Sequence, residues 1–149
     1  MLRSYPINYR SYDIKEITLE DCLPLRQSIL WPALTEAECV TPGDKKATHF
    51  GSFDGDVLIG CASFHHISDK EMRIRRVAVL PQYRGHGIGS FLLKTALERM
   101  QLPHLEEIWL NARIPAQNFY KRLGFHTVGE RFFEREVEEI RMIKKAMSV

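Results

Sequence analysis

Residues 76–90 read RVAVLPQYRGHGIGS, an apolar run followed by three glycines at alternate positions. The run Val77–Leu80 has the length and the β-branched content of a buried strand. Pro81 ends that strand, because proline cannot donate to a sheet ladder. After the glycines, apolar residues recur at helical spacing, at Ile88, Leu92, Ala96 and Met100. The segment therefore predicts a strand, a tight glycine turn and a helix.

The start of this helix has the features of an anion-binding site. No Ser, Thr, Asp or Asn directly precedes Ile88, so the first backbone N–H groups lack a side-chain cap. Such N–H groups and the helix dipole attract negative charge, and Arg84 adds a cation beside them. The pattern is not a P-loop, because no lysine lies between Gly89 and Ser90, and its third glycine comes one position too early for the dinucleotide fingerprint. Taken alone, the segment fits either a phosphate site or a tight connection without a ligand.

Two segments carry a resemblance to a known family. Gln82–Gly87, QYRGHG, matches Gln/Arg-x-x-Gly-x-Gly/Ala, and Asn118–Phe125, NFYKRLGF, matches the later part of Ala-x-x-Phe-Tyr-x-x-x-Gly-Phe. On these residues the chain resembles the GCN5-related N-acetyltransferase (GNAT) superfamily, from about Ile14 to Met142. In that family the glycine turn binds the pyrophosphate of acetyl-coenzyme A (acetyl-CoA), and the preceding strand pairs with the pantetheine arm. The cofactor contacts that the resemblance implies are Val77, Ala78, Val79, Gln82, Arg84, Gly85, His86, Gly87, Ile88, Gly89, Ser90, Asn111, Asn118 and Tyr120.

The resemblance also assigns Tyr120 to proton transfer. When an amine attacks the thioester carbon, the CoA sulfur leaves as a thiolate, and a phenol beside it can donate a proton. From its helical spacing alone, Tyr120 is equally a core residue of an amphipathic helix. For the base that takes the amine proton, the sequence leaves three alternatives: Glu71, the pair His65–His66, and an unassigned group or water.

Acceptor contacts are expected near the N-terminal helices, which form one wall of the acceptor pocket in the resembled family. The candidates on this wall are Arg26, Trp31 and Glu36, and two further candidates, His65 and Arg75, lie on the predicted strands. The alternative interpretation is that the polar ones lie at the surface and that the tryptophan belongs to the core. The arginines at 73, 75 and 76 hint at an acidic acceptor, although solvated strand ends explain them as well.

The strand that leads into the glycine turn changes phase along its length. Met72 and Ile74 lie at even positions, whereas Val77 and Val79 lie at odd ones, after two arginines. A β-bulge produces such a shift. The resembled family has a bulge in this strand, which splays from its neighbour there and admits the pantetheine arm. A strand buried on both faces would carry the same residues without a bulge.

The remaining patterns predict one α/β domain over residues 1–149, with 1–12 as a lead-in. Asp-Gly at 54–55 between two β-rich runs is a strong hairpin signal, and Thr18 has the position of an N-cap for a helix ending near Trp31. Residues 132–143 have a helical pattern, but we expect two strands, 125–133 and 137–144, because a final hairpin completes the resembled sheet. That sheet is mixed, mostly antiparallel, of about six or seven strands, and flanked by about four helices.

Composition narrows the class of protein. A formal net charge of +2 is too small to argue for nucleic acid or an anionic membrane as a partner. No apolar run reaches the roughly 20 residues of a membrane-spanning helix, and the N-terminus lacks a signal peptide's apolar region. The 3 cysteines form no C-x-x-C pair and suit free thiols in a reducing cytoplasm. No Cys/His cluster has metal-ligand spacing, so we expect no metal.

The resemblance therefore implies an acyltransferase that moves the acetyl group of acetyl-CoA to a primary amine of a small molecule or peptide. We expect direct attack in a ternary complex, because neither signature segment contains a cysteine. The alternative is a CoA-binding module that senses or regulates without catalysis. The sequence leaves open the acceptor, the length of the acyl group, and whether the protein is a monomer or a homodimer.

Overall fold

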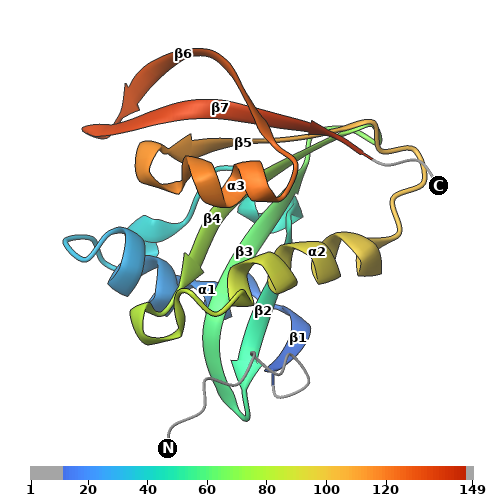
Figure 1. Ribbon diagram of the computed structural model, residues 1–149. Coiled ribbons are helices and arrows are strands. Elements are labelled where there is room, and N and C mark those ends of the chain that lie inside the picture. Colours follow the sequence, from blue (N-terminus) through green and yellow to red (C-terminus); the bar gives the residue numbers. More distant parts are fainter. Residues whose placement is uncertain (1–11, 147–149) are drawn as a thin grey trace, which may run out of the picture. The chain divides into compact units, whose positions relative to one another are not determined.

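The computed structural model describes residues 12–146, and its strands form one seven-stranded sheet in the order β1-β2-β3-β4-β5-β7-β6 (Figure 1). The strands are β1 (Tyr12–Ile17), β2 (Thr48–Asp54), β3 (Val57–His66), β4 (Glu71–Val79), β5 (Glu107–Arg113), β6 (His126–Glu134) and β7 (Val137–Lys145). The helices are α1 (Leu19–Leu25), α2 (Ile88–Met100) and α3 (Gln117–Arg122). The short helical turns are η2 (Arg26–Leu30), η3 (Ala37–Cys39), η4 (Asp44–Lys46), η5 (Pro81–Tyr83) and η6 (Ile114–Ala116).

This mixed sheet with flanking helices confirms the predicted fold class. Except for Tyr12, the predicted lead-in lies outside the described residues. Within residues 12–146, no helix combines the length and the apolar character that crossing a membrane requires. The described part of the chain divides into two compact units, each made of two segments. Unit 1 comprises 12–63 and 76–101, and unit 2 comprises 64–75 and 102–146.

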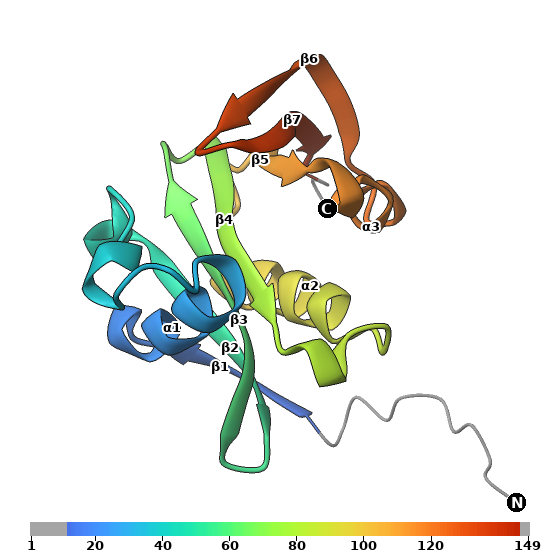
Figure 2. The same cartoon turned by 90° about the vertical axis from the view of Figure 1, so that its left-hand side faces the viewer.

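Unit 1 places α1 and α2 on opposite faces of the strands β1 to β3 (Figure 2). β1 pairs antiparallel with β2, and β2 turns into β3 through Gly55, whose φ of +60° confirms the expected tight hairpin. The N-cap at Thr18 is also confirmed, because Thr18 and Asp21 exchange reciprocal side-chain-to-backbone hydrogen bonds of 3.1 Å. The buried face of α1 contributes Cys22 and Leu25 to a core cluster that also contains Cys61 and Ala78.

The helix expected to end near Trp31 is regular only as far as Leu25. It continues as a π-helical turn over Arg26–Leu30. Pro24 lies inside α1 and lacks the N–H that would continue the α-helical ladder, so the winding changes directly after it. Within residues 35–42, the helical structure is limited to the short turn η3.

Unit 2 contains the sheet strands β5, β7 and β6, together with the last residues of β3 (64–66) and the first part of β4 (71–75). β4 runs parallel to β5 from Glu71 opposite Glu107 to Arg73 opposite Trp109, and β7 runs antiparallel to both β5 and β6. The final hairpin is confirmed. In β7, the buried Ile140 and Met142 alternate with the exposed Arg141, and this period of two is that of a strand.

Candidate functional site

The glycine turn has an open backbone. Gly85 and Gly87 both adopt φ of +78°, a left-handed conformation that side chains rarely tolerate. Apart from Gly85 and its two chain neighbours, no atom of residues 12–146 lies within 4 Å of the position that a Cβ would take at Gly85. Gly87 is the N-cap residue of α2 and caps it with no side chain. The first turn of α2 therefore has the uncapped N-terminus that the sequence predicts, with room beside it for a ligand.

The side chains around this turn divide into exposed and buried ones. Gln82, Arg84 and His86 are exposed, and Ile88 and Gly89 are buried under the turn. Arg84 bends back, and its Nε donates to the carbonyl oxygen of Val79 at 3.1 Å. Ser90, at half exposure, completes the group of residues predicted to contact the cofactor.

Tyr83, which was not among the predicted site residues, anchors the turn through a hydrogen bond to β2. The Tyr83 hydroxyl donates to Asp54 Oδ2 at 2.6 Å, and this joins η5 to the end of β2. Tyr12 packs edge-on against the same ring, with 6.2 Å between centroids. The alternation of glycines gives no sign of this contact, because Tyr83 and Asp54 lie 29 residues apart.

The strand β4 is irregular at the predicted place. Arg76 adopts φ of +56°, a left-handed conformation that costs a non-glycine residue on the order of 1 kcal/mol or more. The predicted phase change of burial does not follow it. Ala78 is buried, whereas Val77 and Val79 are half-buried. The interruption turns the backbone locally without moving both valines into the core.

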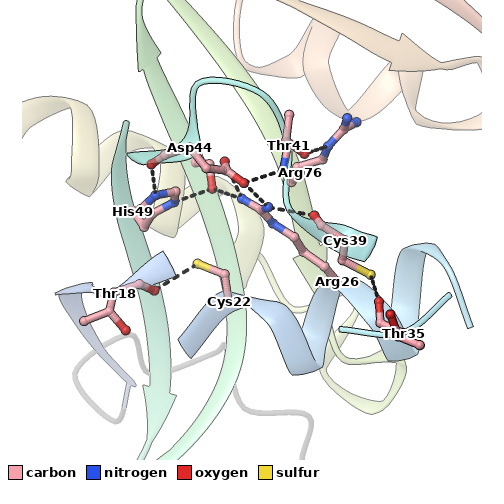
Figure 3. Close-up of polar contacts among 10 residues, drawn as sticks. Thr18, Cys22, Arg26, Thr35, Cys39, Thr41, Asp44, His49 and Arg76 are labelled. Atoms are coloured by element: carbon pink, nitrogen blue, oxygen red, sulfur yellow. Dashed lines mark hydrogen bonds and ion pairs between the residues drawn. The ribbon is translucent and has the colours of Figure 1, made fainter. Parts of the chain in front are cut away.

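Arg26 lies in the interior of unit 1, at 0% exposure (Figure 3). Its guanidinium forms a bidentate ion pair with Asp44, at 2.6 and 3.0 Å, and donates to the carbonyl oxygen of Cys39 and to Ser63 Oγ. His49 contacts the same Ser63 hydroxyl at 2.7 Å. An acceptor contact through Arg26 does not fit this placement, because protein atoms enclose its guanidinium and solvent does not reach it.

The other predicted acceptor residues lie in different surroundings. Glu36 is exposed, Trp31 is half-buried, and the Arg76 guanidinium lies 4.5 Å from the Trp31 ring centroid. His65 is buried and His66 is exposed, which confirms that adjacent histidines of the strand point to opposite faces. Arg75 is half-buried on β4.

In unit 2, Tyr120 is buried on α3, as both of its interpretations require. Its ring packs edge-on against Phe119 and Phe125, with 4.9 and 6.0 Å between centroids. Burial raises the pKa of the Tyr120 phenol well above its ordinary value. The phenol is therefore protonated at neutral pH, as that of a tyrosine with an ordinary pKa is, and it has a proton to donate.

Trp109 organises the face of unit 2 that carries Glu71, and the sequence analysis did not single it out. Its indole Nε1 donates to Glu71 Oε2 at 2.7 Å. The guanidinium of Arg73 lies 4.5 Å from the indole ring, and that of Arg141 lies 4.0 Å from it. Partial burial lowers the pKa of Arg73. The alternating arginines of β4 were the only sequence signal for this cluster. They do not identify Trp109, because it lies on another strand, β5.

The two predicted asparagine contacts differ in exposure. Asn118 is exposed at the start of α3. Asn111 is half-buried on β5, and its Oδ1 atom is buried with no hydrogen-bond partner among the described residues. An acceptor atom in that condition favours a ligand that brings an N–H group.

Comparisons with known proteins agree with this picture. The model of the acetyltransferase (GNAT) family matches residues 12–125. The chain is 31% identical to the uncharacterized N-acetyltransferase YitI of Bacillus subtilis over 128 residues, 80% of this chain and 86% of YitI. It is 41% identical to an N-alpha-acetyltransferase of Sulfurisphaera tokodaii over 63 residues, 40% of this chain and 38% of that protein.

Solved structures share the fold. A GNAT family acetyltransferase from Elizabethkingia anophelis, with acetyl-CoA bound, superposes with a TM-score of 0.69 at 16% identity. The match covers 91% of this chain and 99% of that one.

Proposed function

The chain belongs to the acetyltransferase (GNAT) family, and on this premise we propose that it transfers the acetyl group of acetyl-CoA to a primary amine by direct attack in a ternary complex. The observation that carries the proposal is the glycine turn before α2, with its left-handed glycines, uncapped helix N-terminus and open space. Family membership and the named N-acetyltransferase relatives favour an enzyme over a non-catalytic CoA-binding module.

In this proposal the backbone N–H groups of residues 85–90 bind the pyrophosphate, and Arg84 and His86 lie beside it. The pantetheine arm pairs with the backbone of Val77–Val79, and Gln82 and Asn118 add polar contacts. The unpartnered Oδ1 of Asn111 would accept from an amide N–H of the ligand. Ile88 and Gly89 are buried and support the turn.

The chemistry needs a proton donor for the leaving thiolate and an acceptor for the amine proton. We propose Tyr120 as the donor, because it occupies the tyrosine position of the second signature segment and its phenol carries a proton at neutral pH. We propose Glu71 as the base, and the hydrogen bond from Trp109 fixes the orientation of its carboxylate. Placing the amine against the thioester, and backbone N–H groups against its carbonyl oxygen, would supply most of the rate.

Direct transfer, without an acyl-enzyme, is supported by the cysteines. Cys22, Cys39 and Cys61 form no disulfide among the described residues, and each has 0% exposure. A thiol that forms an acyl-enzyme must reach the thioester, and these three lie enclosed in unit 1.

The first test is a thermal melt with and without acetyl-CoA at about 100 times its dissociation constant. A specific site then adds about 2.7 kcal/mol, a rise of about 5–10 °C for a chain of this length. Gly85→Leu should abolish the rise. Gly55→Leu is the matched control, because Gly55 also has a left-handed φ, +60°, and open space around its Cβ position, but lies in the β2–β3 turn. No rise for the wild type, or equal loss in both variants, would overturn the cofactor site.

Turnover is then measured as thiol release from acetyl-CoA with two acceptors, a peptide with a free α-amine and a small primary amine. The peptide is chosen because one relative is named an N-alpha-acetyltransferase. Glu71→Gln should reduce turnover with both acceptors, because the amide cannot take up the amine proton. A variant with full turnover would remove Glu71 from the mechanism.

A further inference from the structure

Arg76 combines a left-handed backbone with an anchored side chain. Its φ of +56° lies inside the strand β4, where residues without a constraint are extended. Its Nε donates to Thr41 Oγ1 at 2.8 Å, and its guanidinium stacks over the Trp31 ring at 4.5 Å. One side chain therefore contacts two points, ten residues apart, of a segment that precedes the sheet strand β2.

That segment is residues 31–44, and it reaches η4 at Asp44. Its backbone hydrogen bonds form short local turns, among them η3 and the turn from Thr41 to Asp44. Side chains connect it to more distant parts of unit 1. Arg26 fixes it from the interior through the Cys39 carbonyl oxygen and the Asp44 carboxylate. The Thr41 backbone N–H donates to Asp44 Oδ2 at 2.6 Å (Figure 3). The contacts form a continuous path from Arg76 through Thr41 and Asp44 to Arg26.

We propose that Arg76 is a positioning residue that holds residues 31–44 against the irregularity of β4. The inference rests on the proposed function, because this segment matters for catalysis only if it forms the expected wall of the acceptor pocket. The strained conformation at Arg76 aims its side chain at Trp31 and Thr41, and those contacts keep the strain in place. Through Arg76, the strand proposed to bind the thioester and the wall proposed to bind the amine have one fixed arrangement.

The test compares Arg76→Gly with Arg135→Gly. Both variants replace an arginine of left-handed φ, +56° and +50°, by the residue that adopts this conformation without strain. Only the first removes the contacts to Trp31 and Thr41. Thr41→Val is a third variant, which keeps the shape of the side chain and removes the acceptor of the Arg76 hydrogen bond. Hydrogen exchange of the backbone amides of residues 31–44 is measured in each.

In Arg76→Gly, we expect exchange in residues 31–44 to become about tenfold faster or more. In Thr41→Val it should become faster by a smaller factor, and in Arg135→Gly it should stay as in the wild type. The dissociation constant of acetyl-CoA should stay within about twofold, while KM rises for the acceptor, peptide or small amine, that the wild type turns over. Unchanged exchange in Arg76→Gly would overturn the proposal, and so would acceleration spread over all of unit 1, or faster exchange with an unchanged KM for that acceptor. If the wild type binds no acetyl-CoA, the proposed function fails, and the exchange data still decide whether Arg76 holds the segment.

Discussion

Tyr120 is the residue on which the proposed chemistry depends most directly. Its phenol is enclosed by Phe119 and Phe125, so Tyr120→Phe removes one oxygen and leaves the packing. We expect kcat to fall by about 100-fold or more, because general acid catalysis contributes on that order, while the acetyl-CoA dissociation constant changes little. Thiol release and calorimetric titration measure the two quantities. Unaltered kcat would leave Tyr120 as a core residue only.

The same residue predicts a pH dependence of stability. Burial raises the pKa of Tyr120 above the ordinary value of 10.0. Above pH 10 the unfolded chain loses this proton and the native chain keeps it, so stability is unaffected below that pH and falls as pH rises through it. The slope from one group is about 1.4 kcal/mol per pH unit. Urea unfolding measures the free energy of unfolding of the wild type and of Tyr120→Phe between about pH 9 and pH 11. The wild type should lose stability relative to Tyr120→Phe as the pH rises through this range. An equal pH dependence of the two proteins would contradict the burial of the phenol.

Asp44 carries a stability prediction, because it is the only carboxylate seen paired with Arg26 among the described residues. Asp44→Asn keeps the shape but leaves a buried guanidinium without its counter-charge, a change that typically costs about 3–5 kcal/mol. Chemical denaturation measures the loss. Glu106→Gln is the control, because its pair with Lys70 is largely exposed, with N–O at 3.9 Å, and should matter little. Similar losses in the two variants would contradict the buried ion pair.

At the scale of elements, the turn between β6 and β7 has an unusual sequence. Arg135 and Glu136 both adopt left-handed φ, +50° and +66°, as in the two-residue turns that favour Asn-Gly. We expect Arg135→Asn combined with Glu136→Gly to raise stability by about 1 kcal/mol and the melting temperature with it. Gly55→Ala, in the other tight hairpin, should act in the opposite direction, since Gly55 has φ of +60°. A lower melting temperature for the double variant would mean that these side chains stabilise the turn by other contacts.

Elements with local signals were predictable, and those set by distant partners were not. The helix at Ile88–Met100 follows from its own periodicity, and the N-cap at Thr18 follows from the residues next to it. The role of Arg26 did not follow from sequence, because its partners Asp44 and Ser63 lie 18 and 37 residues away. The final hairpin needed knowledge of the sheet, since the pattern of residues 132–143 is helical and the pairing of β7 with β5 overrides it.

At the scale of the whole molecule, the path of the chain helps to decide whether the protein unfolds as one domain, as the sequence predicts. β3 passes from unit 1 to unit 2 after Ser63, and β4 passes back after Arg75. Cutting either unit out would sever both strands, and the seven strands share one hydrogen-bonded order. This connectivity favours one cooperative unfolding transition over two.

The 2 tryptophans make that prediction measurable, because Trp31 belongs to unit 1 and Trp109 to unit 2. In Trp109→Phe, fluorescence reports on unit 1 alone, and in Trp31→Phe it reports on unit 2 alone. In each variant the fluorescence midpoint in urea should coincide with the midpoint from circular dichroism, which follows both units. Calorimetric and van't Hoff enthalpies of the wild type should also agree. Because each substitution shifts overall stability, the two midpoints are compared within the same variant. A fluorescence transition separated from the circular dichroism transition would show that the two units unfold as separate domains.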